Sequence, residues 1–176
     1  MPSVCLYFKI HQPYQLKKYA VQDIGSNHNY EDMVADEANI NRVSDESYLR
    51  TNNLILELIK STNKRFKVSY SISGTTLDLL QKYRPDVIES FKELVDTGCV
   101  EILAETYFHS LSFLYSKKEF ECQVKKHSEL VQYLFGKKTS VFRNTELIFN
   151  NQLAAHIASL GYKGILCEGV FRLLNG

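Results

Sequence analysis

The stretch "FKVSYSISGTTLDLLQKY", residues 66–83, joins a run typical of a β-strand to a pattern typical of an α-helix. Val, Ile, Phe and Tyr fill the apolar positions up to Ile72, as in strands. The following "DLLQKY" is helical, and Pro85 breaks it before a second helix that Gly98 closes. A strand followed directly by helices is part of a βαβ unit.

Strand-like composition recurs in four further runs, residues 3–10, 99–104, 139–145 and 163–167. Helical patterns lie between them, over residues 48–61, between Ser116 and Gly136, and over residues 150–161. Ser116 is the expected N-cap of the long middle helix, and Gly136 follows its last turn. This alternation predicts parallel strands joined by right-handed crossovers, so the expected fold class is α/β.

Residues 11–46 interrupt this order. The segment is rich in Asn, Asp and Ser and shows little periodicity. Closing so long a loop costs entropy that packing or a ligand has to offset. We therefore expect a functional loop here.

Composition indicates one soluble globular domain. Of the 176 residues 44% are hydrophobic and 23% are charged, and 21 Lys and Arg balance 20 acids without a basic block, so nucleic acid is not an expected partner. No run approaches the about 18 apolar residues that a membrane helix needs, and the first residues do not resemble a signal peptide. We expect a cytoplasmic protein whose cysteines, Cys5, Cys99, Cys122 and Cys167, are reduced and buried.

Polar residues collect where the predicted strands end. Parallel α/β sheets and barrels bind ligands at the carboxyl ends of their strands. The residues at these ends are His11, Glu105, His109, Glu146 and Glu168. Glu101 is different, because it lies within a strand, on the same face as Leu103 and Glu105, and so needs a polar partner.

Each of these residues also has an ordinary structural interpretation. Glu146 and Glu168 could be acids that favour the amino end of a helix. His11, which precedes Gln12 and Pro13, could be a turn residue whose ring packs. His127 and His156 fall within helices and are expected to be surface or packing residues.

Two carboxylates at a strand-end cleft suggest acid/base or nucleophilic work on a glycosidic bond. A metal centre is not expected, since the sequence has no His-x-x-x-His or His-Glu-x-x-His pattern. A phosphate loop and a serine nucleophile are not indicated either, because the Gly-x-x-x-x-Gly-Lys and Gly-x-Ser-x-Gly patterns are missing.

Three segments resemble, in order, the first three sequence regions of glycoside hydrolase family 57, in particular its α-amylase-like branch. They are "CLYFKIHQPYQL" (5–16), "GCVEILAETYFHSL" (98–111) and "VFRNTELIFNN" (141–151). The resemblance implies an incomplete parallel (β/α) barrel of seven strands, of which residues 1–176 would be the amino-terminal portion, truncated after about five strands. It also implies a retaining reaction on α-glucans such as starch, glycogen or maltodextrin, without a cofactor or metal.

Individual roles follow from the same resemblance. Glu146 corresponds to the nucleophile, and His11 to a histidine that hydrogen-bonds the sugar at the cleavage point. Glu101 would help to hold the substrate, and Glu105 and His109 match the longer amylase-like form of the second region. Which glucan is used, and whether the enzyme hydrolyses or transfers, do not follow.

The family's acid/base aspartate belongs to a fourth region, similar to Asp-Tyr-Glu-Thr-Phe-Gly-Glu-His, which this sequence lacks. We therefore expect the isolated chain to have little activity and to self-associate through exposed barrel edges. One alternative is a non-catalytic carbohydrate-binding or assembly fragment of the same fold. Another is a metal-dependent polysaccharide deacetylase, whose barrel has a similar architecture.

Overall fold

The computed structural model describes residues 4–26 and 28–169. Its strands are β1 (Tyr7–Ile10), β2 (Val68–Ile72), β3 (Val100–Ile102), β4 (Val141–Arg143) and β5 (Gly164–Leu166). Strands β1, β2 and β3 form one parallel sheet in that order, and β4 pairs in parallel with β5. A single parallel bridge, Ala104 to Phe142, joins the two sheets. Each predicted strand run contains a strand, and the α/β fold class is confirmed.

The helices that follow β1 and the other strands include α2 (Leu49–Ser61), α3 (Gly74–Tyr83), α4 (Pro85–Asp96), α5 (Lys117–Phe135) and α6 (Asn151–Ser159). Helices α4, α5 and α6 lie within the predicted capping residues, whereas α3 begins at Gly74, earlier than the predicted run that starts at Asp78. At the start of α5 the Ser116 hydroxyl accepts a hydrogen bond from the Glu119 amide at 3.2 Å. At its end Gly136 has a φ of 65°, the left-handed conformation that glycine adopts without a steric cost.

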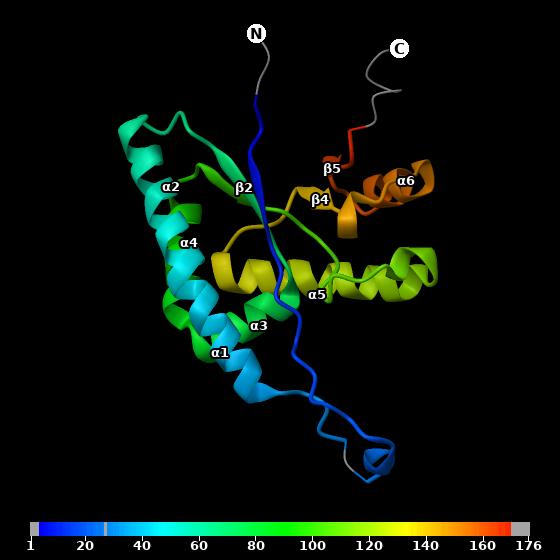
Figure 1. Ribbon diagram of the computed structural model, residues 1–176. Helices are drawn as coiled ribbons and strands as arrows, with labels where there is room; N and C mark the ends of the chain where they lie inside the picture. Colours follow the sequence, from blue (N-terminus) through cyan, green and yellow to red (C-terminus); the bar gives the residue numbers. More distant parts are fainter. Residues whose placement is uncertain (1–3, 27, 170–176) are drawn as a thin grey trace.

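The two faces of the larger sheet differ in chemistry. Ile10, Tyr70, Ile72 and Ile102 are buried in the main hydrophobic core with residues of α2, α3 and α4. Figure 1 shows α1 (Met33–Val43) and helices α2 to α4 gathered on one side of β1 and β2, with α6 beside β4 and β5. Because side chains alternate along a strand, the opposite face carries Lys9 of β1, Ser71 of β2 and Glu101 of β3. The face without this helical cover is therefore polar.

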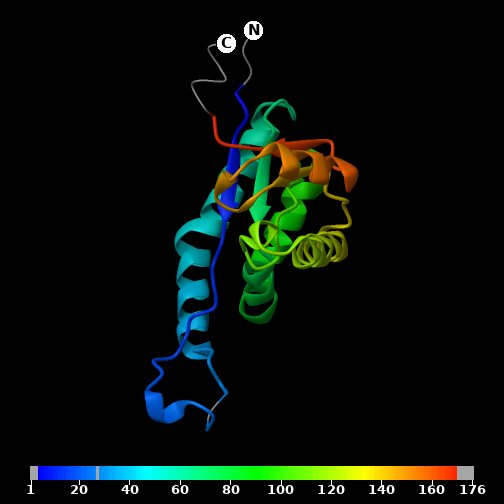
Figure 2. The same cartoon turned by 90° about the vertical axis from the view of Figure 1, so that its right-hand side faces the viewer.

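The prediction of a loop over residues 11–46 was wrong in its second half. Helix α1 (Met33–Val43) begins at Asp32, whose side chain accepts a hydrogen bond from the Ala35 amide, and a π-helical turn (Ser44–Tyr48) leads into α2. Of the α1 residues only Asp36 and Ile40 are buried, so the helix has no apolar stripe that sequence periodicity could reveal. Residues 16–26 and 28–31 belong to an arm that extends beyond the body of the molecule in both views (Figures 1 and 2).

The expectation of buried cysteines was also wrong in part. Cys99 is buried, whereas Cys5, Cys122 and Cys167 are exposed. Cys5 precedes β1 and Cys167 follows β5. Among the described strands, β1 and β5 each pair with a neighbour on one side only. No helix in residues 4–26 and 28–169 is long and apolar enough to cross a membrane.

Candidate active site

Four of the predicted site residues lie together at the carboxyl ends of β1, β3 and β4. His11 follows β1, Glu105 and His109 follow β3, and Glu146 follows β4. The rings of His11 and His109 stack with centroids 4.2 Å apart. His109 Nε2 lies 2.8 Å from Glu146 Oε1, and His109 Nδ1 lies 3.2 Å from Glu105 Oε2. One histidine therefore bridges the two carboxylates.

Glu146 is not a helix-start acid. Helix α6 begins only at Asn151, where the Asn150 side chain is the cap. Glu146 instead lies in a short turn with left-handed backbone, φ 52°, followed by Leu147 with φ 58°. Non-glycine residues adopt this conformation at an energetic cost, and such strain collects at functional sites. The turn directs the Glu146 carboxylate toward β1 and the loop after β3.

A lysine that the sequence analysis did not single out completes the surroundings of Glu146. Lys9 Nζ donates to Glu146 Oε1 at 2.7 Å. The hydrogen bonds from Lys9 and His109 lower the pKa of the Glu146 carboxyl to about 2. The carboxylate is therefore ionised at neutral pH, as a nucleophile has to be.

Glu105 is buried, with 1% of its side chain exposed. Ser71 Oγ donates to Glu105 Oε1 at 3.1 Å, and Arg143 Nη1 lies 3.7 Å from Glu105 Oε2. Arg143 is itself 2% exposed, and its Nε and Nη1 have no hydrogen-bond partner among the described residues. A buried carboxylate with these contacts is not placed to touch a sugar, but it can hold His109 from behind.

His11 is fixed by residues at the start of α3. Its Nδ1 lies 2.8 Å from Ser73 Oγ, and the Thr76 hydroxyl accepts from the Gln12 amide at 2.7 Å. Burial and, to a smaller extent, the neighbouring His109 lower the pKa of His11 to about 4. The ring is therefore neutral at pH 7, and its Nε2 is not engaged by Ser73. The segment "SISGTT" thus anchors a histidine.

His127 proves to be a packing residue. Its side chain on α5 is fully buried, with Nε2 donating to the Ile72 carbonyl at 2.8 Å and Nδ1 accepting from the Glu105 amide at 3.4 Å. Burial lowers its pKa, in keeping with a neutral ring. His127 thereby ties α5 to the ends of β2 and β3, directly beneath the site.

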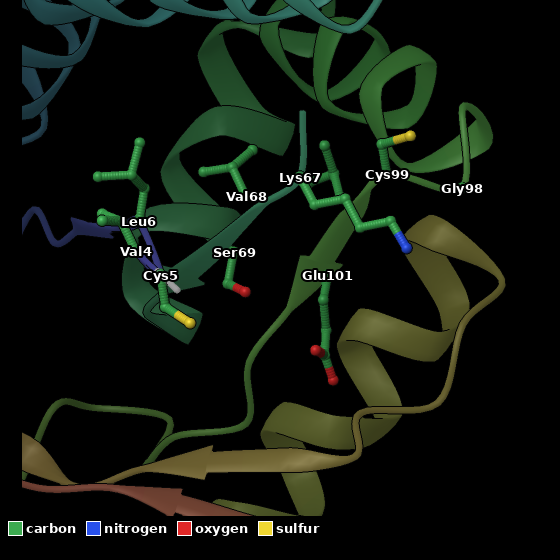
Figure 3. Close-up of a pocket in the computed structure, with 10 residues that line it drawn as sticks. Val4, Cys5, Leu6, Lys67, Val68, Ser69, Gly98, Cys99 and Glu101 are labelled. Carbon is green, nitrogen blue, oxygen red and sulfur yellow. The ribbon is translucent and has the colours of Figure 1, made fainter. Parts of the chain in front are cut away.

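The structure does not bring Glu101 or Glu168 into this group. Glu101 Oε1 accepts from Ser140 Oγ at 2.6 Å, and Glu168 is exposed beyond β5. Glu101 lines a pocket of about 380 Å³ at the amino ends of β1, β2 and β3, shown in Figure 3 with Cys5, Ser69 and Cys99. This is the opposite end of the strands from Glu146.

The family profile of Glycosyl hydrolase family 57 matches residues 5–176. The chain belongs to glycosyl hydrolase family 57. A curated relative from Methanocaldococcus jannaschii, described as "Putative alpha-amylase", is 40% identical over 174 residues, which cover 96% of this chain and 36% of the relative. The chain thus spans little more than a third of the length of that relative.

Two solved structures share the fold. The 4-alpha-glucanotransferase of Thermococcus litoralis superimposes with a TM-score of 0.65 and 18% identity, covering 92% of this chain and 21% of its own. The alpha-amylase AmyC of Thermotoga maritima superimposes with a TM-score of 0.62 and 12% sequence identity, and the match covers 92% of this chain and 38% of AmyC.

The polysaccharide deacetylase alternative has a basis in architecture. A family 4 carbohydrate esterase from Bacillus anthracis shares the fold with a TM-score of 0.51 at 15% identity, over 68% of this chain and 52% of its own. Among the described residues, however, no group of three or more His, Cys, Asp or Glu is arranged to hold a metal ion. The family 57 profile covers the same residues, so the likeness to the esterase is one of fold.

Proposed function

We propose that this chain supplies the nucleophile of a retaining, α-amylase-like glycoside hydrolase that acts on α-glucans. The observation that carries the proposal is the Glu146 carboxylate, exposed on a strained turn and held by Lys9 and His109 at the carboxyl ends of parallel strands. Its lowered pKa keeps it ionised, and an ionised carboxylate can attack an anomeric carbon. The family and its α-amylase-like relative support the substrate class.

In this proposal the two stacked histidines form the floor of the sugar site. Ser73 fixes the His11 ring, leaving Nε2 to donate to or accept from a sugar hydroxyl. His109 touches the nucleophile directly. The proposal includes neither Glu101, which is bound to Ser140 at the other end of β3, nor Glu105, which is buried.

Retention needs a second carboxylic acid that protonates the leaving oxygen, about 5 to 5.5 Å from the nucleophile. Glu105 shares a histidine with Glu146, but its burial and its contacts with Ser71 and His109 prevent it from reaching a leaving group. We propose that this acid comes from outside the 176 residues. Hydrolysis of ordinary glucans by the isolated chain is then expected to be lower by about 10² to 10⁴-fold.

Trapping with 5-fluoro-α-glucosyl fluoride tests the nucleophile without needing that acid, because fluoride leaves unprotonated. The expected result is one glucosyl adduct on the chain, mapped by peptide mass spectrometry to Glu146. The Glu146→Gln variant should not be labelled, and Glu105→Gln should still be labelled at Glu146. An unlabelled wild type, or a label on another residue, contradicts the proposal.

A non-catalytic carbohydrate-binding or assembly fragment is the second candidate, because the other carboxylate beside Glu146, that of Glu105, is buried and bonded to Ser71 and His109. Isothermal titration with maltoheptaose separates the two candidates. Binding without a trapped adduct indicates the fragment, and binding with the adduct on Glu146 indicates the enzyme.

A further inference from the structure

The two oxygens of the Glu146 carboxylate have different surroundings. Oε1 is the acceptor for both Lys9 Nζ at 2.7 Å and His109 Nε2 at 2.8 Å. Among the described residues no hydrogen bond to Oε2 is found. Since a carboxylate attacks through a lone pair on one oxygen, the protein itself distinguishes the oxygens before any sugar arrives.

We infer that Lys9 is a positioning residue for the nucleophile: with His109 it holds Oε1 of Glu146, so that Oε2 is the attacking atom. The inference rests on the proposed function of Glu146. Lys9 extends from β1, where it lies opposite Ser71 of β2, so its backbone is fixed by the sheet. His109 is fixed by Glu105, so both donors to Oε1 belong to ordered parts of the fold.

The attraction between the opposite charges of Lys9 and Glu146 is a minor part of the role of Lys9. The side chains of Lys9 and Glu146 are 33% and 62% exposed, and ion pairs so exposed contribute little to stability. What two donors on one oxygen provide is orientation. They restrict the carboxylate to one rotamer, and correct placement of a reacting atom is a large part of the rate enhancement that enzymes achieve.

In the first step Oε2 forms a bond to the anomeric carbon while the bond from that carbon to the leaving oxygen breaks. The leaving oxygen keeps the electron pair and takes a proton from a carboxylic acid. With the trapping reagent the bond that breaks is the carbon–fluorine bond, and fluoride leaves with its electron pair and needs no proton. Lys9 transfers no proton in this step. Because Oε2 becomes the bridging oxygen of the new ester, the carbonyl oxygen of that ester is Oε1, which still faces Lys9 and His109.

The test compares Lys9→Gln and Lys9→Met with Lys92→Gln. Lys92 is a matched control, because it lies 2.7 Å from Glu89 with side-chain exposures of 36% and 66%. The measurements are the trapping rate with the fluoro-sugar as a function of pH and the ¹³C NMR titration of the Glu146 carboxyl carbon. Circular dichroism establishes which variants are folded.

For the wild type and Lys92→Gln, we expect the Glu146 carbon to titrate with a midpoint of about 2. In the Lys9 variants we expect that midpoint and the acid limb of the trapping rate to move to higher pH. The rate at pH 7 should fall by about 10-fold or more, as expected when a reacting group loses its orientation. A crystal structure of the adduct should show the ester at Oε2.

The possible failures are distinct. If the wild type is not labelled, the proposed function fails. If the wild type is labelled and either folded Lys9 variant matches it in rate and titration, or the ester forms at Oε1, the role of Lys9 is overturned.

Discussion

The imidazole rings of His11 and His109 stack with their centroids 4.2 Å apart, although the two residues are 98 positions apart in the sequence. One ring closes the end of β1 and the other lies in the loop after β3. Two histidinium rings at this distance would repel each other. Burial of the His11 ring, together with this contact, therefore favours its neutral form and lowers its pKa to about 4.

This shift predicts how stability depends on pH. The folded chain binds a proton at His11 only near pH 4, whereas the unfolded chain binds one near its ordinary pKa of 6.5. Stability from this residue is thus fully present above pH 6.5 and is lost as the pH falls toward 4. Urea unfolding between pH 7 and pH 4 should be less pH-dependent in His11→Gln than in the wild type. The control is His28→Gln on the exposed arm, which should keep the wild-type dependence of the free energy of unfolding on pH. If that dependence is the same in all three proteins, the prediction is contradicted.

The two residues of the proposed sugar site should differ in the size of their effects. With the proposed acid present, Glu146→Ala should lower kcat by several orders of magnitude, because the proposed covalent intermediate cannot form. His11→Ala should mainly raise KM and lower kcat more mildly, because the proposal gives His11 a contact with the sugar and none with the reacting atoms. Steady-state kinetics on a maltooligosaccharide series checks this, and small, equal effects from both substitutions would argue for structural roles.

Gly74 is expected to tolerate no side chain. A Cβ at this position would lie 2.5 Å from the ring of Tyr107, which is buried and held by Asp78. Gly74→Ala should cost about 1 to 3 kcal/mol in the free energy of unfolding, as overpacking does. Gly164→Ala is the matched control, because its nearest contact would be an ordinary 3.8 Å. Urea denaturation of both variants provides the comparison, and equal midpoints would show that Tyr107 can move aside.

The outer edge of β1 should make the isolated chain associate. Among the described strands β1 pairs only with β2. Val4 and Leu6, which precede β1, and Tyr7 and Phe8, which lie within it, are exposed. Unpaired edges with apolar side chains promote strand pairing between molecules. Sedimentation velocity should show association that rises with concentration and is reduced in Leu6→Lys. A wild-type chain that stays monomeric at high concentration would count against it.

Local patterns predicted most of the fold. The strands and capped helices followed from composition and from residues such as Ser116 and Gly136. The meeting of His11, His109 and Glu146 followed because carboxyl ends of parallel strands share one edge. Helix α1 was missed because it buries little apolar surface.

Other residues of the site could not be predicted in the same way. Lys9 and Arg143 lie inside strands, and the sequence marks them only as charged residues within apolar runs. Which acid each of them contacts depends on the register between the strands. Glu101 carries the same signal but faces the opposite end of the sheet. Position along the strand, which sequence fixes poorly, separates these cases.

The join between the two sheets has a mechanical consequence. Its backbone part consists of two hydrogen bonds, from the Ala104 amide to Val141 and from the Arg143 amide to Ala104. Lys9 lies on one side of this seam and Glu146 on the other, while α5 packs into the hydrophobic clusters of both sides. A small lateral slip of one half past the other would therefore separate the lysine from the carboxylate. Substitutions of the α5 residues that pack into these two clusters are therefore expected to change the position of the Glu146 carboxylate relative to Lys9.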